Sequence, residues 1–294
     1  EEAMRREYAI KQLTRKQKLK NYSKHPGSFL LALLTKLAIL LTVLALGFIL
    51  IYILVKGIPN LSTDLFALKY TTENVSMLPA IINTLIITLL SLCIAGPIGI
   101  FSAIYLVEYA KKGNKLVGVV RVTAETLTGI PSIVYGLFGM LFFVTTLKCG
   151  YSLLAGALTL SIMVLPVIMR TTEEALLAVP NSFREGSFGL GAGKLRTIFK
   201  IVLPSAVPGI LAGVILAIGR IVGETAALIY TAGTVAEIPS SIMSSGRTLA
   251  IHMYSLSKEG LYTDQAYATA VVLLIVVVLI NMLSNFVAKK FTKK

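Results

Sequence analysis

Long apolar runs alternate with short polar and basic stretches along this chain of 294 residues. A helix needs about 20 mostly apolar residues to cross the hydrocarbon core of a bilayer. Six segments meet this requirement: residues 29–55, 77–107, 126–147, 152–169, 207–230 and 266–288. The pattern therefore predicts an all-α, polytopic membrane protein with six transmembrane helices.

Composition supports burial in lipid rather than a soluble core. The chain is 55% hydrophobic and only 14% charged, whereas a soluble domain carries about 25% charged residues. Residues that face lipid must be apolar as well as those that face the core. The first apolar segment exceeds the 7–15 residues typical of a signal-peptide core, so we interpret it as an uncleaved anchor.

Basic residues are distributed unequally between the two sets of loops. The formal net charge is +14, and most of it lies in residues 1–28, after the second and fourth segments, and at the C-terminal end. The other loops hold only Lys56, Lys69, Lys148, Arg247 and Lys258. Lysine and arginine concentrate on the cytoplasmic side of membrane proteins. We therefore expect both termini in the cytoplasm, a basic tail (1–28) beside membrane lipid, a transmembrane domain (29–294), and no nucleic-acid partner.

The loop at residues 170–205 has more structure than a plain connector needs. Thr171 and Ser182 each stand three residues before a glutamate, which is the spacing of a helix-starting capping box. Pro180 is expected to stop the first short helix, and three glycines follow the second. A third, amphipathic stretch at 195–202 leads into the fifth apolar segment.

This loop resembles the EAA loop of binding-protein-dependent ABC-importer permeases. The resemblance rests on Glu185, Gly186 and Ser187, on Gly191 and the adjacent Ala192, and on the run from Ile201 to Leu203 and Pro204. Gly186 and Ser187 replace the family's two alanines, but both remain small. The resemblance implies a type I (MetI-like) importer fold and a coupling helix at 181–194 that docks on a separate ATPase subunit.

The energy source is not expected in this chain. A phosphate-binding loop requires GxxxxGK followed by Ser or Thr, whereas Phe188 stands at the first glycine position and Leu195 follows Lys194. No nucleophile with its base, paired carboxylates or metal-ligand cluster is evident in the sequence. We therefore predict no catalytic or metal-ligating residues and no cofactor here, with ATP and Mg expected on the partner ATPase.

Two charges lie inside the fifth apolar segment. Arg220 and Glu224 are four residues apart, so one continuous helix would place them on the same face. Arginine stays cationic and binds oxyanions through its fork of donors. Either the two residues pair to fix helix packing, or Arg220 lines a translocation pathway for an anion with Glu224 as its counter-ion.

Further stretches are similar to the permeases of the phosphate ABC importer, and to their A-type subunit in particular. They are residues 129–136 (GIPSIVYG), 219–228 (GRIVGETAAL), 247–260 (RTLAIHMYSLSKEG) and 266–274 (AYATAVVLL). The resemblance implies a second, C-type permease, two ATPase subunits and an extracytoplasmic phosphate-binding protein as partners. The alternatives are a permease for another oxyanion or solute, or a secondary transporter.

Overall fold

The computed structural model describes residues 26–111 and 113–292. Nearly all of the expected basic tail, residues 1–25, lies outside this range. Within the described residues all regular structure is helical, as expected. Up to residue 55 the chain forms one compact unit, and residues 56–294 form a second.

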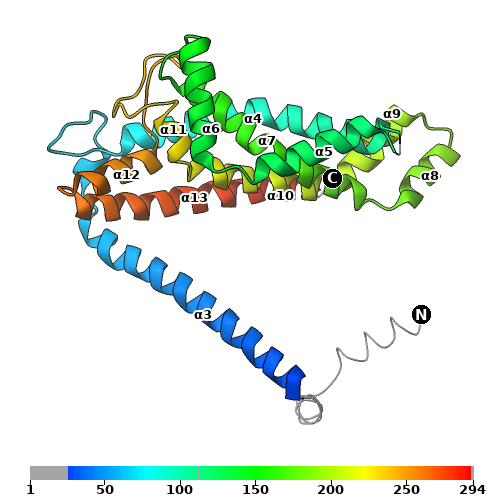
Figure 1. The fold of residues 1–294 in the computed structure, drawn as a ribbon, viewed down its shortest axis with the longest axis horizontal. Helices are drawn as coiled ribbons and strands as arrows, with labels where there is room; N and C mark the ends of the chain where they lie inside the picture. Colours follow the sequence, from blue (N-terminus) through cyan, green and yellow to red (C-terminus); the bar gives the residue numbers. More distant parts are fainter. Residues whose placement is uncertain (1–25, 112, 293–294) are drawn as a thin grey trace. The chain divides into compact units, whose positions relative to one another are not determined.

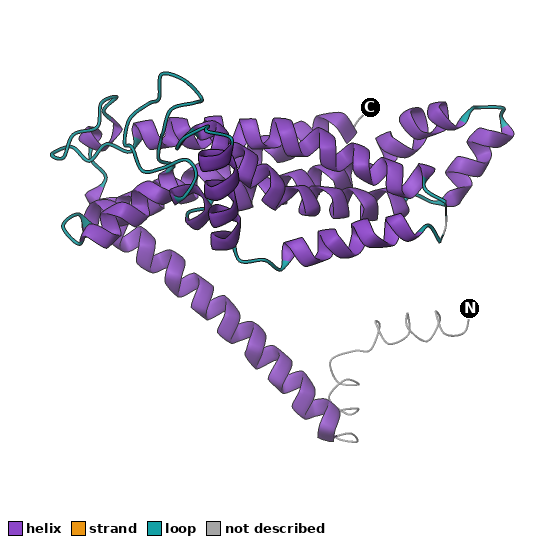
Figure 2. Ribbon diagram, turned by 45° about the horizontal axis from the view of Figure 1, so that its top comes forward, coloured by secondary structure: helices purple, strands orange, loops and turns teal. Residues whose placement is uncertain are grey.

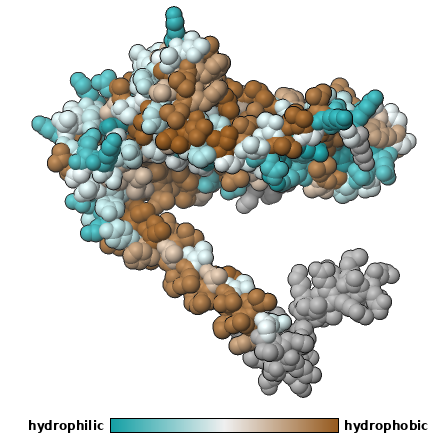
Figure 3. Space-filling view, in the orientation of Figure 1, coloured by the Kyte–Doolittle hydropathy of each residue, from teal (hydrophilic) through white to brown (hydrophobic). Residues whose placement is uncertain are grey.

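The first unit holds most of one long helix, α3 (Pro26–Gly57). Its apolar side chains are exposed all round, including Leu31 and Phe48, which are 67% and 69% exposed. Figure 3 shows this helix covered by hydrophobic residues along its length. Thr35 and Thr42 hide their hydroxyls by donating hydrogen bonds to carbonyls one turn earlier. Such a surface is suited to lipid and confirms the first predicted span.

The second unit is a bundle of long helices (Figures 1 and 2). Helix α7 (Leu153–Leu177) packs against both α4 (Leu78–Ile104) and α10 (Leu203–Val222), and α10 also contacts α13 (Thr263–Thr292). Helix α4 continues into a π-helical turn, η3 (Tyr105–Tyr109). Helices α4, α7 and α13 confirm the second, fourth and sixth predicted spans, although α7 runs eight residues beyond the predicted end.

The third predicted span is not one continuous helix. Helix α5 (Lys115–Thr128) is followed by α6 (Ser132–Gly139) and a π-helical segment, η4 (Met140–Thr146), and the two parts are bent by 104°. The break falls at Pro131, which lacks a backbone donor and disfavours helical geometry at the residue before it. Residues 26–111 and 113–292 therefore contain five helices long and apolar enough to span, or six if this bent pair counts as one span.

The fifth predicted span, 207–230, is displaced along the chain. Short helix α9 (Lys194–Thr197), π-helical segment η5 (Ile198–Val202) and α10 form one run that ends at Val222. A separate turn of helix, α11 (Ala226–Ile229), follows. The remaining elements are η1 (Ile58–Asn60), η2 (Thr63–Phe66), α8 (Asn181–Gly189) and α12 (Leu249–Glu259).

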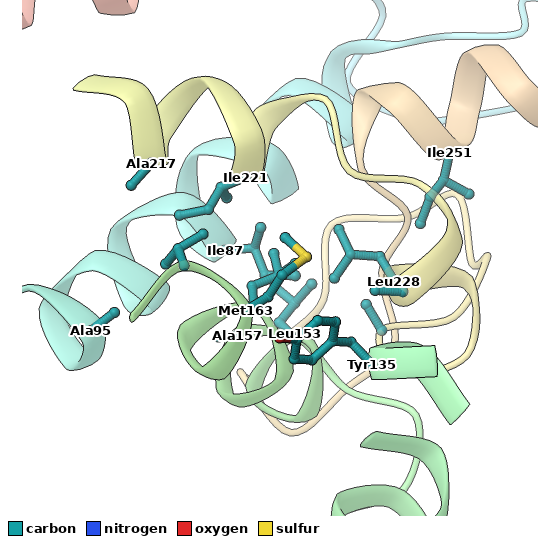
Figure 4. Close-up of a cluster of buried hydrophobic side chains, with 14 of the residues drawn as sticks. Ile87, Ala95, Tyr135, Leu153, Ala157, Met163, Ala217, Ile221, Leu228 and Ile251 are labelled. Carbon is teal, nitrogen blue, oxygen red and sulfur yellow. The ribbon is translucent and has the colours of Figure 1, made fainter. Parts of the chain in front are cut away.

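The main apolar core joins six of these helices. Its members include Ile87 of α4, Tyr135 of α6, Met163 of α7, Ile221 of α10, Leu228 of α11 and Ile251 of α12, as Figure 4 shows. Polar side chains within the core satisfy themselves locally; for example, the buried Ser161 hydroxyl lies 2.6 Å from the carbonyl oxygen one turn earlier. This core therefore fixes the last turns of α10, which carry Arg220, and the short helix α11, which begins two residues after Glu224.

Candidate functional site

Neither of the two short helices expected at the start of the coupling loop begins at its predicted capping box. Residues 171–177 belong to the end of α7, and the Thr171 hydroxyl donates back to the Val167 carbonyl instead of capping a new helix. Helix α8 begins at Asn181, directly after Pro180, and Ser182 is not its cap. Both predicted capping boxes are therefore wrong. Proline placed just before the first helical residue supplies the turn that separates α7 from α8.

Arg184 anchors α8 to the rest of the bundle. Its Nη2 and Nε atoms lie 2.6 and 3.1 Å from Glu108 Oε1 on η3, and its side chain also donates to the carbonyls of Val179 and Leu176, at 2.8 and 2.9 Å. The charged side chains are only 15% and 9% exposed. This clamp fixes α8 relative to α7 and η3. Sequence reasoning missed it because its two charges are 76 residues apart.

Hydrogen bonds between nearby residues stabilise the turn after α8. Ser187 and Thr197 share a buried hydrogen bond between hydroxyls of 2.8 Å, and the Ala192 amide donates to the Ser187 carbonyl at 3.1 Å. Gly191 has a φ of +81°, which side-chain-bearing residues rarely adopt. Ser187 thus has a polar role in addition to its small size, and Gly191 is required by backbone geometry.

The outer surface of α8 and its turn is exposed and apolar. Phe183 and Phe188 are each 48% exposed and Leu190 is 91% exposed. A groove of about 300 Å³ lies beside them, lined by Ser187, Leu190, Gly191, Ala192, Arg196, Lys200 and Ile201. Large exposed apolar side chains beside charged ones are typical of protein-binding surfaces. We call this surface, α8 with its following turn, the α8 surface.

The other residues of the EAA-like motif do not line this groove and differ in their exposure. Glu185 and Gly186 are exposed on α8, and a Cβ atom at Gly186 would contact nothing within 4 Å. Leu203 is partly buried, whereas Pro204 is exposed in the first turn of α10. The motif therefore spans α8, its turn and the start of α10.

Arg220 occupies the last turn of α10 and is partly buried. The ion pairs and hydrogen bonds found among the described residues include none from its guanidinium. Its charge acts on the phenol of Tyr135 of α6, which itself donates to the Leu127 carbonyl at 2.7 Å. The guanidinium of Arg220 is therefore not engaged by any ion pair with the described residues.

Glu224 does not face Arg220 along one helix. Helix α10 ends at Val222, and the Glu224 Oε1 atom instead accepts a hydrogen bond of 3.0 Å from the Ala227 amide at the start of α11. The expectation of one shared helix face was wrong, because Gly223 ends the helix before the second charge. The Glu224 side chain thus binds the first turn of α11, and the ion pairs of the described residues do not include one between Arg220 and Glu224.

The glycines of α10 have two different roles. A Cβ atom at Gly209 would lie 2.6 Å from Ala175 Cβ, and one at Gly213 would overlap Thr171 Oγ1. Gly209 and Gly213 therefore allow α10 to pack closely on α7. Gly219, in contrast, has no neighbour within 4 Å of a Cβ atom.

A second charged cleft, of about 310 Å³, lies between α5 and α7. Arg121 pairs with Glu173, and Arg170 pairs with Glu174 at 3.2 Å and with Glu125 at 3.7 Å. The pairs Arg121–Glu173 and Arg170–Glu125 join α5 to α7 across the cleft, whereas Arg170–Glu174 lies within α7. Within the described part of the chain, no group of three His, Cys, Asp or Glu residues is arranged to hold a metal ion.

Comparison with known proteins identifies the class. Residues 95–294 match the family model of the binding-protein-dependent transport system inner membrane component. The chain is 32% identical to a probable ABC transporter permease protein, YqgI, of Bacillus subtilis, with 83% of this chain and 88% of that protein aligned. It is 36% identical to the phosphate transport system permease protein PstA of Pasteurella multocida, over 87% and 92% of the two chains.

Solved structures share the fold. A bacterial alginate ABC transporter, in complex with an alginate-pentasaccharide-bound periplasmic protein, superposes with a TM-score of 0.66 at 17% identity, covering 93% of this chain and 98% of the other. The MetNI methionine ABC transporter superposes with a TM-score of 0.56 at 21% identity, covering 74% and 94%. The chain belongs to the family of inner membrane components of binding-protein-dependent transport systems. It is a transmembrane permease of an ABC importer with the MetI-like fold.

Proposed function

We propose that this permease carries inorganic phosphate across the cytoplasmic membrane, and that Arg220 contacts the anion on its way. The observation that carries this proposal is the guanidinium of Arg220 in the last turn of a membrane-spanning helix, where it makes no ion pair with any described residue. A charge within a membrane span costs several kcal/mol, so it normally faces a pore or a partner group. The 36% identity to a phosphate transport permease supports phosphate as the oxyanion.

The α8 surface is the proposed contact with an ATPase. It presents two phenylalanines, an almost fully exposed leucine and a groove. The Arg184–Glu108 clamp connects it to α7 and η3, so a force applied to α8 reaches the spanning helices. In this proposal two separate ATPase subunits bind and hydrolyse ATP with Mg, and the chain itself performs no covalent chemistry.

The proposed assembly contains a C-type permease beside this chain and a phosphate-binding protein outside the cell. Both termini lie in the cytoplasm, as the distribution of basic residues favours. Residues 1–25 of the expected basic tail lie outside the described residues, so the proposal that the tail lies beside membrane lipid rests on its sequence.

Uptake by the assembled complex in proteoliposomes tests this function. Accumulation of radiolabelled phosphate is expected to require internal ATP and the external binding protein. Excess unlabelled phosphate should abolish accumulation of label, whereas excess sulfate should leave it within about twofold. Equal inhibition by sulfate or by a neutral solute would support a permease of different substrate. Accumulation without ATP would support a secondary transporter.

A further inference from the structure

A second cationic group lies buried at the end of the bundle opposite α8. Helix α12 occupies this end together with the loops at 56–77 and 230–248 (Figure 1). Arg247 is located in the second of these loops, two residues before α12, and is only 6% exposed. It belongs to neither the α8 surface nor the turn around Arg220.

The position of Arg247 is fixed by its backbone and by one aromatic ring. Its amide donates to the Val235 carbonyl at 2.8 Å, and its carbonyl accepts from Asn83 Nδ2 at 3.2 Å. Its guanidinium carbon lies 4.5 Å from the centre of the Tyr70 ring. The backbone and ring contacts therefore hold the side chain in place without using its donors.

One edge of this guanidinium has no acceptor. Nε and Nη2 are both buried without a hydrogen-bond partner, and the ion pairs of the described residues include none from Arg247. These two nitrogens form the side-on fork of arginine, the edge that binds two oxygens of one carboxylate or phosphate. Burying a cation whose donors are unmet is strongly unfavourable. A cation–π contact offsets only part of that cost.

Neighbouring polar groups are also unpaired. Thr248 is 1% exposed and His252 is fully buried. Neither the Thr248 hydroxyl nor either ring nitrogen of His252 has a hydrogen-bond partner among the described residues. The His252 ring meets the Tyr70 ring edge-on at 6.2 Å, so Arg247 and His252 flank the same tyrosine. The Thr248 hydroxyl lies at the N-terminus of α12, an 11-residue helix whose dipole favours negative charge.

We propose that Arg247, Thr248 and His252 form a binding site for a small tetrahedral oxyanion, separate from Arg220. The Nε–Nη2 edge of Arg247 supplies two donors, the Thr248 hydroxyl supplies a third, and a ring nitrogen of His252 supplies a fourth. Assigning inorganic phosphate as the anion rests on the proposed function. Because this end of the bundle lies opposite the α8 surface, the site receives the anion before Arg220 does.

Protonation of His252 would add a second positive charge to this site. Burial, assisted by the charge of Arg247, lowers the pKa of His252 to about 3. The Val75 backbone opposes this shift weakly, although its geometry falls short of a hydrogen bond to either ring nitrogen. At neutral pH the ring is neutral and supplies one donor, so Arg247 alone carries the positive charge.

Thermal unfolding of the full-length permease in detergent tests this site without any transport step. The Arg220→Gln variant, which lacks the pathway cation, is heated with inorganic phosphate or with sodium chloride at equal ionic strength. Phosphate is expected to raise the melting temperature by about 2–5 °C, since a ligand that binds only the folded state stabilises it. In the Arg220→Gln/Arg247→Gln double variant this rise should vanish.

A milder pair of variants decides the question if loss of Arg247 prevents folding. Thr248→Val, in the Arg220→Gln background, should raise the phosphate concentration for half-maximal stabilisation about fivefold. Thr159→Val is the matched control: this threonine is equally buried, but its hydroxyl already donates to the Ala155 carbonyl, so the phosphate response should not change.

Two results would overturn the site. One is a phosphate response that is the same with and without Arg247, or the same in Thr248→Val and its control. The other is no phosphate response in the Arg220→Gln protein at all. Failure of phosphate uptake in proteoliposomes would instead refute the proposed function. The melting-temperature measurement would still decide whether phosphate binds at Arg247, because it requires no transport.

Discussion

The clamp between Arg184 and Glu108 yields a prediction whose size follows from the structure. In Arg184→Gln, the Glu108 carboxylate, whose side chain is 9% exposed, loses its cation. The carbonyls of Val179 and Leu176 lose charged donors at 2.8 and 2.9 Å. Removing one partner of a buried pair costs about 3–5 kcal/mol. We take about 3 kcal/mol, since the pair retains some solvent contact.

The loss should appear as local opening of α8. A change of 1.4 kcal/mol is a tenfold change in an equilibrium constant, so amides of α8 should exchange about 100-fold faster with deuterated solvent. Hydrogen exchange of the full-length protein, followed by mass spectrometry, measures this directly. Arg196→Gln is the control because Arg196 is an exposed arginine on the neighbouring α9, and exchange in α8 should change less than threefold.

A double variant separates the ion pair from general damage. Glu108→Gln/Arg184→Gln removes the stranded carboxylate as well, so part of the lost protection should return. If exchange in α8 remains within threefold of wild type in Arg184→Gln, the clamp does not hold the helix. If the double variant is more open than the single, the stranded charge is not the cause.

Three further outcomes are expected. Gly191→Val forces φ +81° on a branched residue, so the complex should assemble but lose transport-coupled ATP hydrolysis; normal phosphate uptake by this variant would argue against the coupling role. Gly213→Val drives a side chain into Thr171 and should lower the melting temperature by several degrees. Gly219→Ala has open space around it and should lower the melting temperature by less than 2 °C. Equal effects of the two variants would contradict the close packing of α10 on α7 at Gly213. The pKa of His252 falls from 6.5 to about 3 on folding. In phosphate-free buffer the free energy of unfolding should therefore be highest above pH 6.5 and decline toward pH 3, by up to about 5 kcal/mol. His252→Leu should flatten the matching decline in melting temperature, and an unchanged profile would exclude His252 as its source.

Apolar run length was enough to locate most spans. Residues 29–55 and 266–288 lie within long helices, and 77–107 does so except for Met77, which precedes the first residue of its helix. The third predicted span is present as a bent pair rather than one helix, because its hydropathy is continuous across Pro131 whereas its helical backbone is not. Run length reports how apolar a segment is, but not whether its helix is continuous. The sequence feature that accounts for the bend is Pro131.

The candidate site could be predicted only where its residues are neighbours in sequence. Gly191 and Ser187 were found from fixed spacing, although the hydroxyl pair between Ser187 and Thr197 was not. Arg220 and Glu224 were grouped by assuming that the helix continues through Gly223, and it does not. Arg247 was noted in the sequence as one of the few basic residues outside the cytoplasmic loops and as the first residue of the similar stretch 247–260, but neither pattern predicted that it is buried. Its burial depends on contacts with Tyr70 and Asn83, which are distant in sequence.

The most direct test of the account is phosphate uptake by the assembled importer with Arg220→Gln. Arg170→Gln is the matched control, because Arg170 lies in exposed ion pairs with two glutamates. We predict that ATP-dependent uptake of radiolabelled phosphate falls at least tenfold in Arg220→Gln and stays within twofold of wild type in Arg170→Gln, while both complexes assemble. Unchanged uptake in Arg220→Gln would contradict the proposal that this arginine contacts the transported anion.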